Sequence, residues 1–387
     1  MGPKIRIVLT GGGTAGHIYP LIAVARELSR RIIERGFESD IRFFGDPGAF
    51  GFELAAAGIR ISKVPASKWR RYFDPQNFFD IFKFTAGVMV SLWKMYWFMP
   101  HVCFSKGGPG ALSVLTATRL YAIPIILHES DTIPGITNRL TARSARVIEL
   151  AFEHAAEYFN AKKTHLVGNP VLDELLGEGE SRPAEEISRG ARAAKIEFGF
   201  DPEKPVILFL GGSQGAERMN EFVLKNIRTL TEKFQVLHQT GRKNYESYQN
   251  EYLFVTKGDE TLKQRYRFMP YFDKNLKNAY DAADVVVARA GAGTIFELAA
   301  LGKPSILIPI PESANNHQVQ NAYVYEKTGG TIVLEEENLH PALLLTTTEK
   351  ILNDPARRQA MSEAAKKFYI PNAAQLITRD ILSILGF

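Results

Sequence analysis

The sequence predicts an α/β protein with two Rossmann-like domains, each built on a parallel sheet. Short apolar runs alternate with helical stretches along the chain, and glycine-rich turns follow three of these runs. Apolar runs without polar alternation are typical of strands covered on both faces, as in parallel βα repeats. At 387 residues the chain is also too long for one typical core, so two domains are expected.

Each predicted strand is a short apolar run. The runs are 5–10, 41–44, 123–127, 206–210, 236–238, 285–288 and 305–308. A polar, charge-rich segment at 177–205 interrupts the rhythm, and we place the domain junction just before it, at 167–170. The predicted domains are 1–167 and 168–368, and a C-terminal helix in 369–387 is expected to pack back on the first. Two such domains are expected to face each other across a cleft at the carboxyl ends of their strands, where the glycine turns lie.

The glycine turn at 289–294 is the most informative motif, because it joins the strand at 285–288 to a helical pattern beginning at Phe296. Glycines let the backbone approach a ligand, and the unpaired N–H groups of a first helical turn attract anions. Glu297 would lie about one turn into the helix, where a carboxylate accepts hydrogen bonds from both hydroxyls of a ribose. Phosphate and ribose at one junction indicate a nucleotide site. For this motif alone, an ordinary tight strand–turn–helix is the alternative.

Two further glycine turns favour the nucleotide interpretation. The turn at 211–216 follows the strand at 206–210, and the turn at 11–17 follows the strand at 5–10. The first turn of the chain departs from a dinucleotide fingerprint, because it ends in the titratable His17 and Pro20 follows. An acidic ribose reader at Asp40 or Asp46 keeps a dinucleotide-binding dehydrogenase as an alternative.

Composition excludes several classes of protein. The net charge of +5 is mild, and no motif for binding nucleic acid is present. The single cysteine, Cys103, excludes an internal disulfide and a cysteine-based zinc site. The eight histidines show no paired-ligand spacing, so no metal is expected. The N-terminus runs directly into a strand, so no signal peptide is expected.

The segment 69–100 holds all three tryptophans together with many Phe and Tyr residues. Its apolar stretch is broken by Lys94 and is too short for a spanning helix. Apolar surface ringed by cations suits the headgroup layer of an anionic membrane. The cations are Lys68, Arg70, Arg71, Lys83 and Lys94. A helix buried against the sheet is the alternative.

Seven motifs carry a resemblance that spans nearly the whole chain. They are GGGTAGHIYP at 11–20, HESDTIPGITNR at 128–139, GNPV at 168–171, GGSQGAERMN at 211–220, HQTG at 238–241, ARAGAGTIFELAALGKPSILIPIP at 288–311 and NHQVQNA at 316–322. In order and spacing they resemble the peptidoglycan N-acetylglucosaminyltransferases that convert lipid I to lipid II. The resemblance implies a GT-B fold, with the donor in the C-terminal half and the acceptor in the N-terminal half. It also implies an inverting, metal-independent reaction without a cofactor.

The partners and location follow from the same resemblance. The donor would be UDP-GlcNAc, and the acceptor would be a sugar linked through pyrophosphate to a polyprenol. The protein would be peripheral, at the cytoplasmic face of the cell membrane, in contact with an anionic membrane surface and with other proteins of cell-wall assembly. Peptidoglycan synthesis would connect it to cell shape and cell division. No nucleic acid partner is expected.

The resemblance also implies roles for individual residues. Glu297 matches a ribose-binding carboxylate, Ser213 a hydroxyl on the donor phosphates, and Gln318 a reader of the GlcNAc hydroxyls. Phe272 falls where the backbone reads the uracil edge. The predicted donor-binding residues are Thr14, Gly16, Asn138, Ser213, Gln214, Phe272, Arg289, Gly291, Ala292, Gly293, Thr294, Glu297, His317, Gln318 and Asn321. The predicted acceptor-binding residues are Gly12, Gly13, His17, His128 and Asp131.

The chain departs from the family pattern at three places. Leu172 stands where an arginine often follows GNPV. The segment 106–111 lacks the aromatic and serine residues usual after the paired glycines. HESD at 128–131 replaces the common HEQN, which changes the residues expected to contact the acceptor.

The reaction needs a base for the incoming hydroxyl and stabilisation of the leaving diphosphate. We assign the diphosphate to the turn at 291–294 and Ser213. His17 is the first candidate for the base, because an ordinary histidine pKa near 6.5 suits proton removal at neutral pH. Glu129 is the second, as base or as the group that orients the acceptor. The structural alternatives are a helix-capping or phosphate-contacting His17, and a strand-end turn at 128–129 held by Asn138.

Two other functions stay open from the sequence. One is another GT-B enzyme that transfers a nucleotide sugar to a different glycolipid, which the departure at 106–111 keeps open. The other is a non-catalytic nucleotide-sugar-binding scaffold of cell-wall assembly. Transfer of labelled GlcNAc from UDP-GlcNAc to lipid I distinguishes all three.

Overall fold

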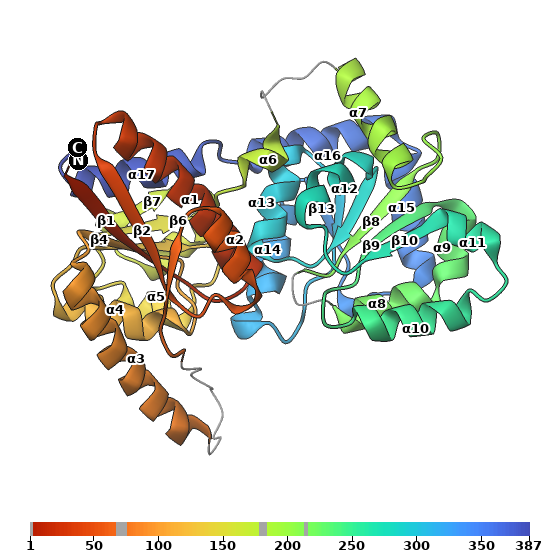
Figure 1. The fold of residues 1–387 in the computed structure, drawn as a ribbon. Helices are drawn as coiled ribbons and strands as arrows, with labels where there is room; N and C mark the ends of the chain where they lie inside the picture. Colours follow the sequence, from red (N-terminus) through yellow and green to blue (C-terminus); the bar gives the residue numbers. More distant parts are fainter. Residues whose placement is uncertain (1–2, 67–75, 178–183, 213–215) are drawn as a thin grey trace. The chain divides into compact units, whose positions relative to one another are not determined.

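A computed structural model describes residues 3–66, 76–177, 184–212 and 216–387. The chain divides into two compact units, Met1–Leu172 with Ile370–Phe387, and Asp173–Tyr369. The junction expected at 167–170 lies a few residues before the first of these divisions. The last helix, α17 (Ala373–Ile384), packs against α1 (Ala15–Glu34) in the first unit. Figure 1 shows the elements of both units.

The described residues of the first unit form a seven-stranded parallel sheet with the order β3-β2-β1-β4-β5-β6-β7. Its strands are β1 (Lys4–Thr10), β2 (Glu38–Gly45), β3 (Arg60–Lys63), β4 (Val102–Ser105), β5 (Ile125–Glu129), β6 (Val147–Leu150) and β7 (Thr164–Leu166). The chain order reverses between β1 and β4, where Leu9 pairs with Phe104. Such a reversal leaves a crevice at the carboxyl ends of the two strands, which is where ligands bind in parallel sheets.

Helices cover both faces of this sheet (Figure 1). They are α1, α2 (Gly51–Ala56), α3 (Gln76–Phe98), α4 (Ala111–Leu120), α5 (Ile136–Thr141) and α17. α1 begins after Thr14 and buries Ile18, Leu21, Leu28 and Ile32, which recur at helical spacing. α3 and α4 pack together, and Met95 and Val114 from the two helices belong to one buried apolar cluster.

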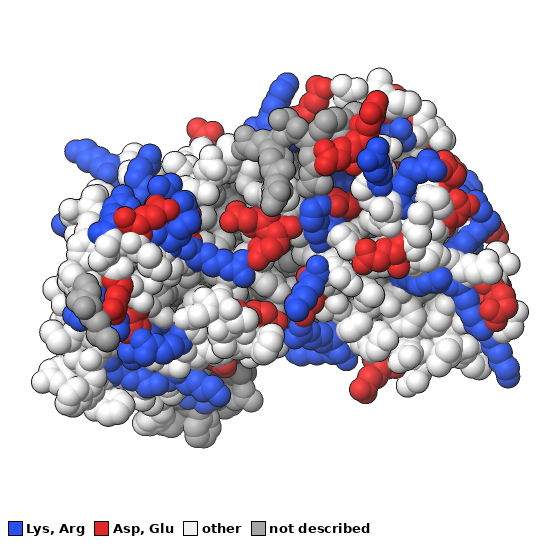
Figure 2. Space-filling view, turned by 45° about the horizontal axis from the view of Figure 1, so that its top comes forward, with Lys and Arg blue, Asp and Glu red and all other residues white. Residues whose placement is uncertain are grey.

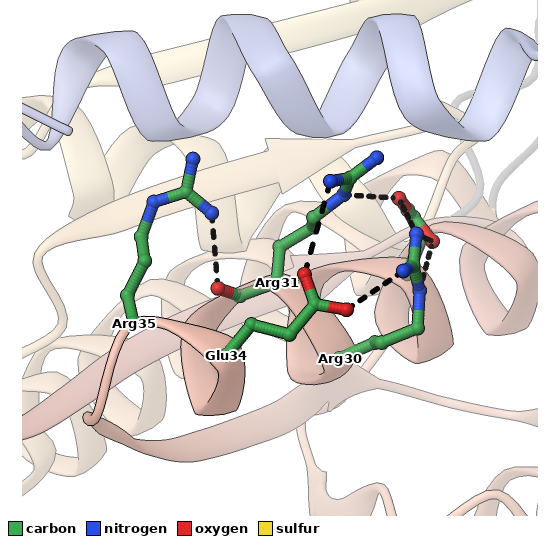
Figure 3. A network of polar contacts seen from close by, with 5 residues as sticks. Arg30, Arg31, Glu34 and Arg35 are labelled. Carbon is green, nitrogen blue, oxygen red and sulfur yellow. Dashed lines mark hydrogen bonds and ion pairs between the residues drawn. The ribbon is translucent and has the colours of Figure 1, made fainter.

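α1 carries a network of ion pairs near its C-terminal end (Figure 3). Arg30 contacts Glu27 at 2.7 Å and Glu34 at 2.8 Å, and Arg31 contacts Glu27 at 2.8 Å. Arg35 donates to the carbonyl of Arg31. Helical pairs at these spacings each add about 0.2–0.5 kcal/mol. On the face drawn in Figure 2, basic side chains lie among acidic ones.

The described residues of the second unit form a six-stranded parallel sheet with the order β10-β9-β8-β11-β12-β13. Its strands are β8 (Val206–Leu210), β9 (Gln235–Gln239), β10 (Tyr266–Met269), β11 (Val285–Ala288), β12 (Ser305–Leu307) and β13 (Thr331–Val333). Its helices are α6 (Asp173–Leu176), α7 (Ala184–Glu197), α8 (Glu217–Lys225), α9 (Ile227–Lys233), α10 (Tyr245–Val255), α11 (Glu260–Arg265), α12 (Leu276–Ala282), α13 (Ala292–Leu301), α14 (His317–Glu326), α15 (Pro341–Leu352) and α16 (Pro355–Phe368). The chain order reverses between β8 and β11, so this unit repeats the plan of the first.

α3 presents two different faces. Ser91, Met95 and Phe98 are buried, whereas Trp93 and Trp97 are 65% and 72% exposed. The two sets recur at helical spacing, so one face packs inward and the other is an aromatic surface open to solvent. Across the described residues, the helices are too short or too polar to cross a bilayer.

The cations expected around this aromatic surface have different environments. Lys83 is exposed and lies 3.9 Å from Asp80. Lys94 donates to the carbonyl of Lys63 at 2.7 Å, and burial lowers its pKa. Lys94 is therefore bound to the end of β3. Lys68, Trp69, Arg70 and Arg71 lie outside the described residues.

Glu149 on β6 is fully buried, and neither carboxylate oxygen has a hydrogen-bond partner among the described residues. It pairs in register with His128 on β5 and His165 on β7. Burial, and then the charge of Asp380, raise the pKa of Glu149 well above its ordinary value. The folded protein therefore favours the neutral form of this carboxyl more than the unfolded chain does.

Replacing Glu149 by Met should stabilise the protein, and more so at high pH. A carboxyl pKa raised in the folded state contributes stability that is complete below the unfolded pKa and is lost as pH rises through the folded pKa. Glu149→Met removes both this pH dependence and the unpaired polar atoms, whose burial costs about 1–3 kcal/mol. Urea unfolding at pH 5.5 and pH 8.5 measures the effect. Equal changes at both pH values would contradict the raised pKa, and Glu149→Gln serves as the uncharged polar control.

Candidate active site

The first glycine turn lies at the carboxyl end of β1, where α1 begins. Thr14 is the N-cap of α1, and its hydroxyl lies 2.8 Å from Nδ1 of His17. The backbone N–H of His17 also donates to the carbonyl of Thr14. A side chain added at Gly12 would meet the His17 ring at 3.0 Å, so the ring lies directly on the glycine turn. This contact orients His17 and also provides the structural role considered from the sequence.

The loop after β4 packs directly onto this turn. Gly107 and Gly108 have φ of +72° and +90°, which glycine adopts without strain. A side chain at Gly108 would lie 2.9 Å from the backbone nitrogen of Gly12 and 3.5 Å from Nε2 of His17. Such close approach leaves room for glycine alone. The two loops therefore form one wall of the crevice between β1 and β4.

Glu129 ends β5 and is 3% exposed. One carboxylate oxygen accepts from the backbone N–H of Asp131 at 3.0 Å. The other accepts from the N–H of Gly135 at 3.1 Å and from Nδ2 of Asn138 at 2.9 Å. Burial and the charge of Asp131 raise the pKa of Glu129, whereas these three donors oppose the rise. The geometry favours the strand-end turn over direct proton transfer, and the assignment of Glu129 as base stays a prediction.

His128 and Asn138 are enclosed beside Glu129. His128 is fully buried, with Nε2 at 2.9 Å from the carbonyl of Gly168 and Nδ1 at 2.8 Å from Nζ of Lys106. Burial lowers the pKa of His128 well below its ordinary value, so the ring is neutral. Asn138 is 2% exposed, and its amide also donates to the carbonyl of His128. Both side chains support the loops, and their predicted contacts with substrates stay predictions.

In the second unit, the glycine turn after β11 leads into α13 as the sequence predicts. Gly291 is the N-cap, and the first turn of the helix has no acidic residue. Gly291, Gly293 and Thr294 are partly exposed, whereas Ala292 is buried. The positive end of a ten-residue helix therefore meets a glycine turn, which is the arrangement that binds phosphate groups.

Glu297 lies one turn after Gly293 on α13. Its Oε2 accepts a hydrogen bond from the hydroxyl of Tyr280 on α12 at 2.7 Å. Burial raises the pKa of Glu297 to about 7, and the Tyr280 hydrogen bond opposes this rise. Its remaining acceptor sites suit a pair of hydroxyl donors.

The first turn of α14 lies beside the glycine turn after β11. Asn321 is buried, and its Nδ2 donates to the carbonyl of Ala290 at 3.4 Å. Oε1 of Gln318 accepts from the backbone N–H of Ile310 at 3.2 Å. His317 is the first residue of the helix. These contacts bring Asn321 to the loop that precedes α13 and Gln318 to the loop that follows β12.

Arg289 and Phe272 are engaged within the second unit. Arg289 is 6% exposed, donates to the carbonyl of Ile308 at 3.1 Å and pairs with Glu336. Phe272 is 1% exposed, and its backbone N–H donates to Oε1 of Gln239 at 3.2 Å. Both roles in donor binding stay predictions.

The structure brings the predicted residues together in two groups, one in each unit. The first-unit group comprises Gly12, Gly13, Thr14, Gly16, His17, His128, Glu129, Asp131 and Asn138. The second-unit group comprises Phe272, Arg289, Gly291, Ala292, Gly293, Thr294, Glu297, His317, Gln318 and Asn321. Ser213 and Gln214 lie outside the described residues. Among the residues described, no cluster of three or more His, Cys, Asp or Glu side chains is arranged to hold a metal ion.

Sequence reasoning missed three partners of these groups. Tyr280 contacts Glu297, Glu336 pairs with Arg289, and Lys106 contacts His128. Lys106 directly follows an apolar run and precedes two glycines, but this pattern does not show that its side chain is buried. Tyr280 and Glu336 come from distant elements, and nothing local in the sequence indicates their contacts.

Two parallel-sheet units with glycine turns at the carboxyl ends of their strands define a GT-B protein. Solved structures agree. MurG from Acinetobacter baumannii matches with a TM-score of 0.68 at 22% identity, covering 98% of this chain and 99% of that chain. A UDP-GlcNAc 2-epimerase from Neisseria meningitidis, bound to UDP-GlcNAc, matches with a TM-score of 0.65 at 13% identity, covering 98% and 100%. At such identities these likenesses establish the fold alone.

The sequence comparisons establish the family. Residues 7–148 match the glycosyltransferase family 28 N-terminal domain, and residues 206–377 match the C-terminal domain. A relative from Caldanaerobacter subterraneus subsp. tengcongensis is 32% identical over 382 residues, which cover 98% of this chain and 100% of that protein. It is named UDP-N-acetylglucosamine–N-acetylmuramyl-(pentapeptide) pyrophosphoryl-undecaprenol N-acetylglucosamine transferase. The chain belongs to glycosyltransferase family 28 and, within it, to the family of these transferases, which confirms the resemblance seen in its motifs.

Proposed function

We propose that the protein transfers GlcNAc from UDP-GlcNAc to lipid I, the undecaprenyl-pyrophosphoryl-MurNAc-pentapeptide, and so forms lipid II. The observation that carries this proposal is the match to a transferase of that name over nearly all of both chains. Both family domains are present, and each carries a glycine turn at the end of a central strand.

The reaction is a single displacement at the anomeric carbon. The acceptor hydroxyl oxygen bonds to C1 of GlcNAc, the bond from C1 to the diphosphate oxygen breaks, and the configuration inverts. The hydroxyl proton passes to a base, and UDP leaves with the bonding electrons. We assign the base to His17, because it lies at the glycine wall of the first unit. This role requires Nδ1–H to donate to the Thr14 hydroxyl, so that Nε2 is the ring nitrogen that accepts the proton.

The donor binds in the second unit. The N-terminus of α13 stabilises the diphosphate, since its N–H groups and dipole favour the negative charge that grows as UDP leaves. Glu297 accepts from the ribose hydroxyls, with Tyr280 holding the carboxylate in place. Gln318 and Asn321 complete the site from α14. We propose a reaction without a metal ion, because the N–H groups at the start of α13 can stabilise the diphosphate charge themselves.

Transfer of radiolabelled GlcNAc from UDP-GlcNAc to lipid I tests the proposal. We expect a lipid-linked product with one added GlcNAc and a rate that EDTA leaves unchanged. Transfer to another polyprenyl glycolipid but not to lipid I would favour the alternative GT-B enzyme. Binding of UDP-GlcNAc without transfer to any lipid would favour the scaffold.

We further propose that α3 holds the protein on the cytoplasmic face of the membrane, where the polyprenyl tail of the acceptor stays. The exposed Trp93 and Trp97, with Tyr96 and Met89, supply apolar and aromatic surface. The exposed Lys83 adds attraction to anionic lipid. The inward face of the helix packs on α4, so the helix itself is anchored in the first unit.

The affinity for UDP should depend on the ionisation of Glu297. Burial raises the pKa of this carboxyl to about 7, and hydroxyl donors favour the ionised form, so binding should weaken as pH falls below 7. The expected limit is about tenfold per pH unit. Glu297→Gln should bind about 10- to 100-fold more weakly at pH 8 and lack this component. Calorimetry at pH 6 and pH 8 measures both proteins. The phosphate of UDP titrates too, so identical pH profiles for the two proteins would contradict the assignment.

Gln318→Ala should raise KM for UDP-GlcNAc and relax discrimination against UDP-GalNAc. The expected loss is about tenfold, because one neutral hydrogen bond to the sugar disappears. Initial rates with each donor measure the ratio of kcat/KM. Gln320, which is exposed on the same helix, supplies the control variant Gln320→Ala. Unchanged discrimination in Gln318→Ala would place the sugar reader elsewhere.

The double variant Trp93→Ala/Trp97→Ala should bind vesicles about tenfold or more weakly, because two apolar rings no longer enter the headgroup layer. Vesicle sedimentation measures binding, which should grow with anionic lipid and fall with salt. Phe254, 84% exposed on α10, supplies the matched control Phe254→Ala. Equal losses in both variants, or wild-type binding in the double variant, would contradict the role of α3.

A further inference from the structure

The side chain of Lys106 is buried beside the candidate site, although the proposed reaction assigns it no role. It follows β4 and is only 2% exposed. A lysine is almost never buried to this extent unless its ammonium group finds partners, because removing the charge from water is costly. The hydrogen-bond partners of its ammonium group therefore indicate its role.

The ammonium group of Lys106 has three acceptors, one for each of its protons. They are Nδ1 of His128 at 2.8 Å, Oγ of Ser130 at 2.5 Å and Oδ1 of Asn169 at 2.9 Å. Nε2 of His128 faces the carbonyl of Gly168, which can only accept, so Nε2 carries the ring proton and Nδ1 accepts from Lys106. Lys106 thus joins the end of β4 to the end of β5 and to the turn after β7.

The backbone around Lys106 extends this connection to both candidate bases. Its N–H donates to the carbonyl of Thr10 at the end of β1. The next residues, Gly107 and Gly108, pack on Asn138 and on the ring of His17. Asn138 in turn holds the carboxylate of Glu129. A displacement of Lys106 would therefore reach His17 through one glycine and Glu129 through the other.

The charges around Lys106 are consistent with an ammonium ion at this position. Glu129, Asp131 and Glu149 each favour its charged form, whereas burial lowers its pKa to about 7. His128 is neutral and opposes the charge less than a protonated ring would. An apolar side chain would leave the three acceptors without a donor, and each buried unpaired polar group costs about 1–3 kcal/mol.

We propose that Lys106 is a positioning residue for the acceptor substrate. Its ammonium group donates a hydrogen bond to each of His128, Ser130 and Asn169 and so fixes the positions of the loops at 106–108 and 129–131. It touches no reacting atom. It acts through Gly108 on His17 and through Ser130 on the neighbouring Asp131. The inference rests on the proposed transfer reaction and assigns Lys106 to the acceptor half of that reaction.

Lys106→Met tests this proposal against a matched control. Lys195 is 6% exposed in the second unit, where it contacts Asp284 at 2.8 Å and the carbonyl of Lys204 at 3.0 Å. Asp284 and Lys204 precede β11 and β8, so Lys195 lies at the edge of the sheet opposite the glycine turns. Lys195→Met therefore removes a buried lysine of similar burial without touching either group of site residues.

The two variants should lose stability alike but differ in catalysis. In Lys106→Met, kcat/KM for lipid I should fall about 10- to 100-fold, because small displacements of reacting groups have effects of this size. KM for UDP-GlcNAc should change less than about twofold. Lys195→Met should keep wild-type kcat/KM for lipid I. Urea unfolding and initial rates with each substrate varied in turn measure these quantities.

Equal kcat/KM losses in both variants would show that Lys106 acts through stability alone and would overturn the proposal, as would wild-type kinetics in Lys106→Met. If Lys106→Met does not fold, Ser130→Ala removes one acceptor and should lower kcat/KM for lipid I about threefold to tenfold, with UDP-GlcNAc KM unchanged. Wild-type kinetics in Ser130→Ala would then overturn it. A wild-type protein without any transfer would contradict the proposed function itself, whereas an active wild type with an unaffected variant contradicts this inference alone.

Discussion

The contact between the loops after β1 and β4 is the constraint on which the first-unit site depends. Parallel strands all end at one edge of the sheet, and the reversal of strand order between β1 and β4 brings these two loops together. At Gly108 and Gly12 the backbones approach so closely that a side chain would lie 2.9 Å from a backbone nitrogen. His17 lies on this wall. The hydrogen bonds of Asn138 with Glu129 and of Lys106 with His128 connect the loop after β4 and helix α5 to the end of β5. The second unit repeats the plan with β8, β11 and the glycine turn before α13.

The sequence was informative where one local pattern determines structure. The apolar runs at 206–210 and 285–288 are β8 and β11 in full, and the glycine turn at 291 starts α13 as predicted. Side-chain partners from distant elements could not be predicted from the sequence. The hydrogen bond from Tyr280 to Glu297 depends on how α12 packs beside α13, which no spacing in the chain encodes. The aromatic segment shows the same limit, because its composition suited both a buried helix and an anchor. α3 has one face of each kind, which only the helical phase of the packed structure separates.

The fold alone does not identify the reaction. A UDP-GlcNAc 2-epimerase shares this fold over nearly the whole chain at 13% identity, although its name states a different chemistry. Both reactions use a nucleotide sugar, so a helix N-terminus for the diphosphate and a carboxylate for the ribose suit either one. The distinction must come from the acceptor half, where a transferase needs a base and a place for a second substrate. His17 and the loops at 106–108 and 129–131 are therefore the residues that bear most directly on the function proposed for this protein.

Desolvation disfavours the charged form of Glu149, Glu297 and Lys106, among other groups. Their surroundings separate their roles. Glu149 has no hydrogen-bond partner among the described residues and lies in the sheet, so its burial lowers the stability of the fold and no hydrogen bond offsets this loss. Glu297 has one partner and keeps acceptor sites for a ligand, which is how a binding carboxylate differs from a structural one. Lys106 has a partner for every proton, so it has no donor left for a substrate and must act by holding its neighbours. For Glu297 and Lys106, the number of hydrogen-bonding positions left unfilled, rather than the size of a pKa shift, therefore indicates which group binds a ligand and which one positions its neighbours.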